Sequence, residues 1–212
     1  MENCVYLSSA YLGPVEYYTK LYAFNSAFIE QHDNYIKQTY RNRCTIASAD
    51  GALTLSIPTE KPETLKCPMK DIRISDHGNW RHLHWNAIES AYSNSAFFEY
   101  YKDDFYPFYK KKYDFLFDFN EELCSLVCNL IDIHPLIKRT DEYKTSFSAD
   151  EHDFRDIIHP KKDFRSEDTH FIAQPYYQVF EPHHGFLPNL SIIDLLFNMG
   201  PESLLILRDG NK

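Results

Sequence analysis

The chain of 212 residues is 43% hydrophobic and 25% charged, with a formal net charge of −9. This balance excludes wholesale disorder, and one hydrophobic core can serve a chain of this length, so we expect a single domain over residues 1–212. The negative charge would repel a phosphate backbone over most of the surface, which argues against nucleic acid as a partner.

The sequence carries no sign of export or of a membrane span. Its start lacks a basic segment followed by an apolar stretch, and the best apolar run, residues 190–199, is broken by polar side chains. We therefore expect a cytoplasmic protein without a transmembrane segment. The five cysteines are irregularly spaced, which favours reduced thiols, and no histidine at ligand spacing completes a metal site with Cys124 and Cys128.

The first thirty residues predict a strand, a helix and a second strand. Residues 5–10 are strand-like, Gly13 and Pro14 mark a tight loop, and apolar side chains then recur at helical spacing from Val15 to Tyr22. A short apolar run follows at residues 27–29. Because strand, helix, strand is the unit of parallel α/β sheets, we expect the two strands to pair in parallel.

The middle of the chain predicts a hairpin and then helices. Two strand-like runs, 43–48 and 52–57, flank Asp50-Gly51, a pair suited to a hairpin turn, and residues 70–74 alternate as a half-buried strand would. One helix begins near Trp80 with Asn79 as the candidate N-cap. A second begins near Asp118, which would form a capping box with Glu121.

The last third predicts an exposed segment and a well-marked helix. Residues 146–169 are rich in charge and poor in aliphatics, as an exposed loop or lid would be, whereas 174–180 reads as a strand and 182–185 as a turn. Ser191 is placed to cap a helix that Gly200 ends. We therefore expect an α/β fold: a three-layer-like core with a partly parallel sheet, a β-hairpin and a helical middle segment.

Candidate binding residues lie in two segments. Residues 34–43 concentrate cations, amides and phenols, so that Arg41 and Arg43 could grip an anion bidentately while Lys37 adds a point charge; the alternative is a solvated strand edge. The charged segment 146–169 could instead close over a substrate or form surface ion pairs. The candidates for substrate binding are Tyr35, Lys37, Arg41, Asn42, Arg43, Asp153, Arg155 and Lys161.

His84 is the candidate catalytic residue. It lies on the apolar face of the helix near Trp80, whereas His82 projects roughly 160° away, so the two histidines are not expected to share a metal. His84 is either a general base in a cleft or a hydrogen-bonded core residue. Cys44, beside Arg43, is either an activated thiol or a small buried hydrophobe. The sequence has no Gly-rich phosphate loop, G-x-S-x-G elbow or H-E-x-x-H helix, and it specifies neither a cofactor nor an oligomeric state.

A family resemblance rests on segments spread over nearly the whole chain: AYLGP at 10–14, YIKQ at 35–38, RNR at 41–43, LSIP at 55–58, Trp80 with His84, AY at 91–92, FFEYY at 97–101 and NLSIIDLLFNMGPE at 189–202. On these segments the sequence resembles the WbqC-like family. It departs from longer members, which open with Gln-Pro where this chain has Ser8-Ser9. Residues 146–169 stand where those members carry a Ser-Gly segment.

The resemblance implies a transferase of surface polysaccharide (O-antigen-type) biosynthesis that adds glycine or another acyl group to a nucleotide-sugar or lipid-linked sugar precursor. Under this hypothesis Arg41, Arg43 and Lys161 bind anionic groups, Tyr35 contacts the sugar and His84 removes a proton. One alternative is a non-catalytic protein that binds a glycan precursor or scaffolds other enzymes. A lesser alternative, suggested by the opening strand, loop and helix, is a nucleotidyl-transferring enzyme.

Overall fold

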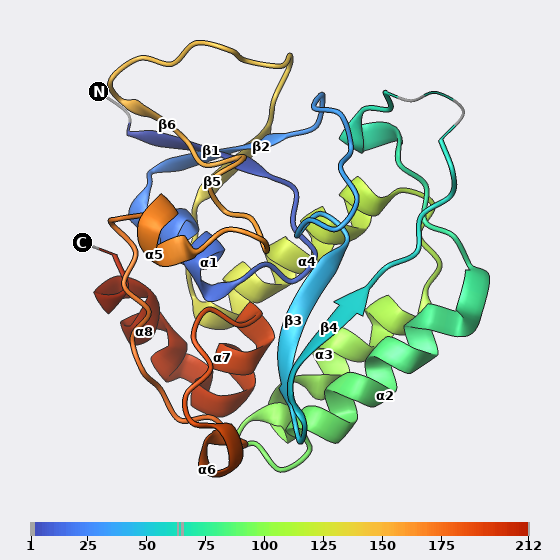
Figure 1. The fold of residues 1–212 in the computed structure, drawn as a ribbon, viewed down its shortest axis with the longest axis vertical. Coiled ribbons are helices and arrows are strands. Elements are labelled where there is room, and N and C mark those ends of the chain that lie inside the picture. The colour runs from blue at the N-terminus through green and yellow to red at the C-terminus, as the bar shows by residue number, and fades with distance from the viewer. Residues whose placement is uncertain (1–2, 63, 65, 212) are drawn as a thin grey trace.

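The structure is a computed structural model that describes residues 3–62, 64 and 66–211, and it confirms the mixed α/β class. Four strands form a wholly parallel sheet in the order β5-β2-β1-β6. Their bounds are β1 (Cys4–Ser8), β2 (Ser26–Glu30), β5 (Leu136–Arg139) and β6 (Glu151–Asp153). A separate antiparallel hairpin joins β3 (Arg43–Ser48) to β4 (Gly51–Ser56) (Figure 1).

The opening unit confirms the predicted parallel pair. Helix α1 (Val15–Ala23) connects β1 to β2, and Val5 and Leu7 of β1 are fully buried. Side chains alternate along a strand, so Tyr6 points to the opposite face, where it stacks on Phe28. Phe147 contacts the Tyr6 ring edge-on. It belongs to the loop between β5 and β6, which runs above the sheet in Figure 1.

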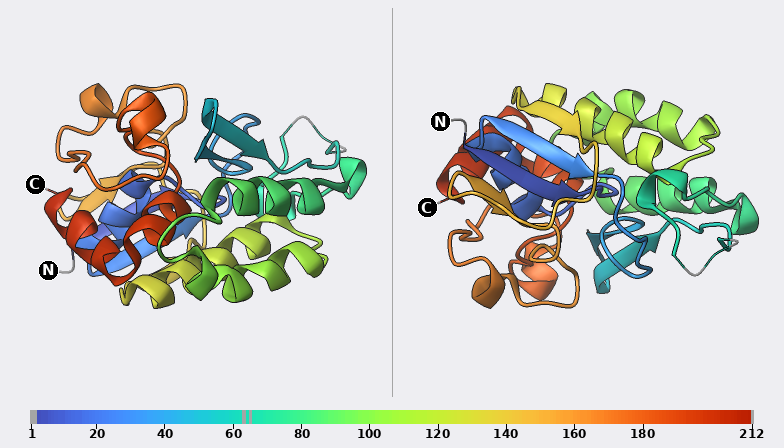
Figure 2. Two further views of the ribbon diagram at one scale, coloured as in Figure 1. Left: turned by 90° about the horizontal axis from the view of Figure 1, so that it is seen from below. Right: turned by 90° about the horizontal axis from the view of Figure 1, so that it is seen from above.

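The hairpin also confirms its prediction. Gly51 begins β4 at φ 105°, a conformation that L side chains rarely adopt, which explains the glycine at this turn. Its partner strand β3 packs against α2 (Trp80–Tyr92). The hydroxyl of Tyr92 in α2 accepts a hydrogen bond from the backbone N–H of Ala47 in β3. The hairpin therefore lies against the helical part of the protein rather than in the parallel sheet (Figure 2).

The helical middle segment consists of α2, α3 (Phe98–Lys110) and α4 (Leu116–Ile131), preceded by the short 3-10 turns η1 (Met69–Asp71) and η2 (His77–Asn79). Two predicted caps are wrong. Asn79 precedes α2 at φ 49° without a side-chain hydrogen bond to it. Helix α4 starts at Leu116, ahead of the proposed capping box, and Asp118 and Glu121 bind Arg139 instead.

Two strand predictions are wrong. Residues 70–74 alternate in polarity, yet the chain forms η1 there and then pairs through single bridges, Arg73 with Phe115 and Ile74 with Thr59. A β-strand requires a continuous ladder of hydrogen-bonded residue pairs, and neither of these two bridges extends into a ladder. Residues 174–180 also form no strand, and the predicted turn that follows is the short helix α6 (Glu181–His184).

The segment 146–169 is not simply the exposed loop that its composition predicts. It contains β6, which pairs with β1 over three residues, and the short helix α5 (Phe164–Glu167). Arg155 and Asp168 are buried, each with an oppositely charged partner: Asp168 pairs with Lys20 of α1 at 2.5 Å. Pairing lets these charges enter the interior, and composition alone does not reveal it.

The C-terminal region comprises α7 (Ile192–Met199), η3 (Gly200–Glu202) and α8 (Ser203–Asp209). Gly200 ends α7 at φ 54°, as predicted. The predicted cap is wrong: Ser191 precedes α7, but its hydroxyl donates to the Leu12 carbonyl at 2.7 Å. Among the described residues, no helix has the length and apolar character needed to cross a membrane.

Candidate functional site

The strand order of the parallel sheet reverses at β1. From β1 the chain proceeds to β2 and β5 on one side, and β6 then returns to the other side of β1. In open α/β sheets, ligands bind beyond the carboxyl ends of the strands at such a reversal. The crevice here, called the switch-point crevice, is lined by Leu7, Ser8, Ser9, Ala10, Tyr17, Thr39, Tyr40, Arg41, Phe154, Arg155 and Ile158.

The switch-point crevice is itself narrow, with a volume of about 10 Å³. It shares Arg41 and Arg155 with a hollow of about 410 Å³, whose other lining residues are His32, Asp33, Asn34, Ile36, Tyr143 and Asp156. A volume of this size falls within the range of small-molecule sites. Arg41 and Arg155 thus line both spaces beyond the carboxyl ends of the strands.

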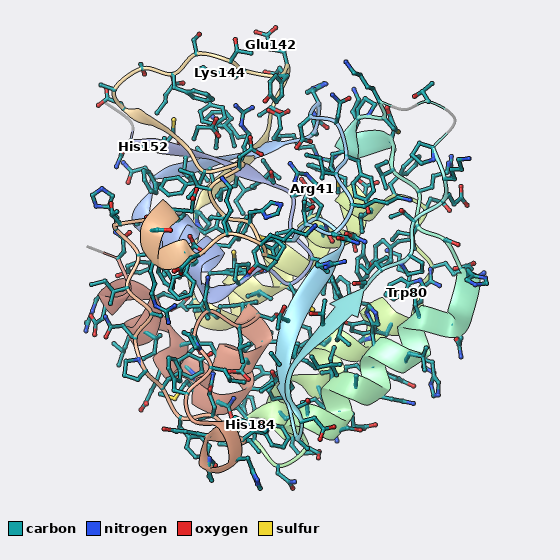
Figure 3. The ribbon with its side chains drawn as sticks, in the orientation of Figure 1. Arg41, Trp80, Glu142, Lys144, His152 and His184 are labelled. Atoms are coloured by element: carbon teal, nitrogen blue, oxygen red, sulfur yellow. The ribbon has the colours of Figure 1, made fainter. Side chains whose placement is uncertain are left out.

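Arg41 lies deep in the molecule, at 4% exposure, between the sheet and the hairpin (Figure 3). It forms an ion pair with Asp33, and its Nη2 donates to the Ser8 hydroxyl at 2.8 Å. Burial raises the pKa of Asp33, and the neighbouring Arg41 opposes that rise. This burial is inconsistent with the solvated strand edge considered for Arg41. Among the described residues, Arg41 Nη1 has one hydrogen-bond acceptor, the Thr39 hydroxyl at 3.5 Å.

Arg155 is fully engaged by protein groups. Its guanidinium donates to both Asp153 oxygens, to Glu30 Oε2 at 2.8 Å and to the Lys144 carbonyl at 2.8 Å. Glu30 is completely buried at the end of β2. The Arg155 guanidinium also lies over the Tyr143 ring, 4.5 Å from its centroid. Arg155 therefore holds β2, β6 and the loop bearing Lys144 together.

Ser8 links the two arginines, because its hydroxyl accepts from Arg41 and donates to the Arg155 carbonyl at 3.0 Å. The charges in this network nearly cancel: two guanidinium groups face the three carboxylates of Asp33, Glu30 and Asp153, which leaves a net −1. The network alone therefore does not provide an excess of positive charge for an anion.

Additional positive charge comes from the segment that follows Ile158 in the crevice wall. The pKa of His159 is lowered by burial and then by the charges of Lys162, Lys161 and Arg41, whereas Asp156 raises it. Lys161 is exposed and its Nζ donates to Gln38 Oε1 at 2.9 Å. This contact joins the two predicted binding segments beside the crevice residues Thr39 and Ile158.

The remaining binding candidates occupy different environments. Lys37 is exposed, next to Gln38. Asn42 is buried and its side-chain amide donates to the Ile57 carbonyl at 3.0 Å, which is a structural contact. Burial raises the pKa of Tyr35, while the charges of Arg41 and Arg43 lower it. Tyr35, Arg41 and Arg43 therefore lie near one another.

Arg43 begins β3 and is half-buried, and its Nε is buried without a hydrogen-bond partner among the described residues. An unpaired buried donor is uncommon and is satisfied when a ligand or water supplies an acceptor. Beside it in the chain, Cys44 is buried, and burial raises the pKa of its thiol. This environment agrees with a small buried hydrophobe rather than an activated thiol.

His84 is enclosed in the core at 5% exposure. Its Nδ1 lies 2.9 Å from the Tyr11 hydroxyl, which in turn lies 2.9 Å from the Tyr109 hydroxyl, and the Trp80 ring packs edge-on against it. Burial lowers the pKa of His84 to about 4, against a hydrogen bond to the Ser56 backbone. The ring is uncharged at neutral pH, and its contacts are those of the hydrogen-bonded core residue considered above.

Sequence reasoning missed the acidic and hydroxyl members of the network: Ser8, Glu30 and Asp33. A signal was available, since Ser8 and Glu30 end the first two strands and Asp33 follows three residues later. Polar side chains at the carboxyl ends of neighbouring parallel strands meet at one edge of the sheet. The predicted parallel pair could therefore have pointed to these residues.

These features define a mixed α/β protein with a crevice at the carboxyl ends of a parallel sheet. The chain belongs to the WbqC-like protein family, whose profile matches residues 9–159 and so includes Arg41, Arg155 and His159. It is also similar to the uncharacterized protein Rv1507c of Mycobacterium tuberculosis (strain ATCC 25618 / H37Rv), with 27% identity over 224 residues, covering 96% of each chain. No solved structure matches the chain.

Proposed function

We propose that the protein binds a phosphorylated sugar precursor in the hollow of about 410 Å³ that shares Arg41 and Arg155 with the switch-point crevice, and transfers an acyl group to it, in surface polysaccharide biosynthesis. The observation that carries this proposal is the clustering of Lys161, Lys162 and Arg41 around His159, whose pKa is lowered first by burial and then by these three charges; Arg41 and Lys162 have carboxylate partners, and Lys161 has none among the described residues. In a chain of net charge −9, such a local concentration of cations favours a phosphate or diphosphate ligand.

In this proposal the residues have separate roles. Lys161 and Lys37 supply exposed charge for the phosphates, and the Nη1 of Arg41 provides a further donor. Tyr35 and Arg43, next to Arg41, contact the sugar side of the ligand. The walls of the site are held in place by protein contacts of Asn42, Asp153 and Arg155. In this proposal these three side chains do not contact the ligand.

His159 is better placed than His84 to take part in proton transfer. It follows the crevice residue Ile158, whereas His84 is enclosed by Tyr11 and Trp80. Its Nδ1 accepts the Lys161 backbone N–H at 3.1 Å, so the uncharged ring carries its proton on Nε2 and can donate it. As the acceptor oxygen or nitrogen bonds to the acyl carbon of an activated ester or thioester, the bond to the leaving group breaks and that group takes the Nε2 proton of His159. The proton that the acceptor releases passes to water, which restores the proton on the ring.

The experiment combines the purified protein with a nucleotide-sugar and an acyl thioester, and follows both by mass spectrometry. Transfer raises the mass of the sugar by one acyl group. His159→Gln should lower the rate about 10²-fold while the protein stays folded. Lys161→Glu should weaken nucleotide-sugar binding, and the matched charge reversal Arg208→Glu, at an exposed position of α8, should not.

A non-catalytic binding protein remains the second candidate, favoured by the network of Arg155, in which each donor group already has a protein partner. A binder would retain the nucleotide-sugar at unchanged mass. Nucleotidyl transfer is distinguished by release of pyrophosphate from a nucleoside triphosphate. Mass change without nucleotide consumption would support acyl transfer, and unchanged mass with every donor offered would refute it.

A further inference from the structure

The hollow beside the switch-point crevice contains an exposed aromatic ring in an otherwise polar lining. Tyr143 belongs to the loop between β5 and β6, directly after Glu142 (Figure 3), and is 49% exposed. Ile36, at 52% exposure, is the other apolar residue among the described residues that line the hollow. The remaining lining side chains are polar or charged. An isoprenoid chain would therefore find little apolar surface here, whereas a planar polar ring could stack on Tyr143.

The Tyr143 ring has a fixed backing. The guanidinium of Arg155 lies over one face, with its central carbon 4.5 Å from the ring centroid, and it also lies over the Phe147 ring at 5.1 Å. A cation placed over an aromatic face attracts the ring and orients it. Arg155 is held in turn by ion pairs with Glu30 and Asp153. One face of Tyr143 is therefore covered, and the exposed part of the ring is accessible to a ligand in the hollow.

Asp156 lines the same hollow and is exposed, and it forms no ion pair within the part of the chain that the structure describes. The pKa of His159 is lowered by burial and by the charges of Lys162, Lys161 and Arg41, whereas Asp156 raises it, so Asp156 lies close to these cations. A free carboxylate repels phosphate. It accepts hydrogen bonds from ribose hydroxyls, however, as an acidic residue does in dinucleotide-binding α/β proteins.

We infer that the hollow binds the nucleoside of a nucleotide-sugar, with the base stacked on Tyr143 and the ribose hydroxyls donating to Asp156. The diphosphate then extends toward Arg41 and Lys161. This inference rests on the proposed function and narrows it, because it selects a nucleotide-sugar over a lipid-linked sugar as the phosphorylated precursor. Every base has a flat face that can stack on an aromatic ring, so Tyr143 selects for a nucleoside without selecting its base.

Calorimetry tests this inference with ligands that share a diphosphate and differ in the group attached to it, so the test does not depend on transfer. Uridine diphosphate or adenosine diphosphate should bind about tenfold more tightly than inorganic pyrophosphate, through stacking of the base. Geranyl diphosphate, which carries an isoprenoid chain, should show no such gain. Tyr143→Ala and Tyr143→Leu should lose the gain, and Tyr143→Phe should keep it, because stacking requires the ring and not the hydroxyl. Tyr143→Leu retains apolar packing against Arg155, which keeps the test valid if Tyr143→Ala does not fold.

The matched control is Tyr177→Ala, which removes a ring that is 56% exposed and outside the lining of the hollow, and it should bind like the parent protein. The parent protein should also prefer a ribonucleoside diphosphate to its 2′-deoxy form, and Asp156→Ala should abolish that preference. An unchanged preference in Asp156→Ala would overturn the ribose assignment.

Three results would overturn the assignment of the base to Tyr143. These are equal affinity of the parent protein for pyrophosphate and both nucleotides, an undiminished gain in Tyr143→Leu, and tighter binding of geranyl diphosphate than of either nucleotide. If pyrophosphate binds the parent protein but not Lys161→Glu, and the nucleotides gain nothing, this inference fails while the proposed phosphate site stands. Absence of binding by every diphosphate would refute both.

Discussion

The enclosure of His84 predicts a specific dependence of stability on pH. In the folded protein the pKa of His84 is lowered to about 4 from a usual value of 6.5, because burial disfavours the charged ring. His84 therefore binds a proton more readily in the unfolded chain than in the folded protein. The stability that depends on the uncharged His84 ring is fully present above pH 6.5 and is lost as pH falls toward 4. Between pH 7 and pH 5 the loss amounts to about 2 kcal/mol in the free energy of unfolding.

The assay is urea unfolding of the parent protein, His84→Gln and His82→Gln at pH 7 and pH 5. His82 lies on the same helix but is exposed and hydrogen-bonds to Asn86, so its replacement should leave the pH dependence unchanged. His84→Gln should remove about 2 kcal/mol of the difference between the two pH values. Asp194, whose pKa burial raises to about 6, contributes a slope of opposite sign in all three proteins and cancels in the comparison. Equal pH dependence in the parent and His84→Gln would refute the reasoning.

Three further substitutions test the packing around the site by thermal or urea unfolding. Gly200→Ala should destabilise by more than 1 kcal/mol, since its φ is 54° and an added Cβ would lie 2.5 Å from the Phe97 ring; wild-type stability would contradict that packing. Arg155→Met should lower the free energy of unfolding by about 3–5 kcal/mol, because it leaves Glu30 buried without its cation. A smaller loss of stability than replacement of an exposed arginine causes would count against the network. Ser191→Ala should cost about 1 kcal/mol through a lost tertiary hydrogen bond, with no change in the helix content measured by circular dichroism.

Local patterns predicted the elements whose neighbours are close in sequence. The opening strand, helix and strand and the hairpin at Gly51 each pair with the next element along the chain, so apolar periodicity and turn residues were sufficient. Strand β6 shows the limit of this reasoning. Its three residues, Glu151–Asp153, are polar. They form a strand because their backbone pairs in parallel with that of β1, which lies far away in the sequence.

The sequence candidates included the cations of this network and Asp153, but not Ser8, Glu30 and Asp33, which contact the two arginines. Arg41 and Lys161 were selected for charge density, and the structure brings their segments together through Gln38. The burial of Arg155 depends on Glu30, 125 residues earlier in the chain, a pairing that no local pattern encodes. The role of His84 could not be chosen from the sequence for a related reason. Its hydrogen-bond partner in the core is Tyr11, which is also distant in the sequence.

Mass spectrometry of the small molecules that the gently purified protein retains tests whether the hollow beside the switch-point crevice holds a phosphorylated sugar. We expect a sugar phosphate or nucleotide-sugar on the parent protein and on Arg208→Glu, and its loss from Lys161→Glu with the fold intact. Retention of a neutral ligand alone, or equal retention of a phosphorylated ligand by both charge-reversed variants, would show that this site does not bind a phosphorylated sugar.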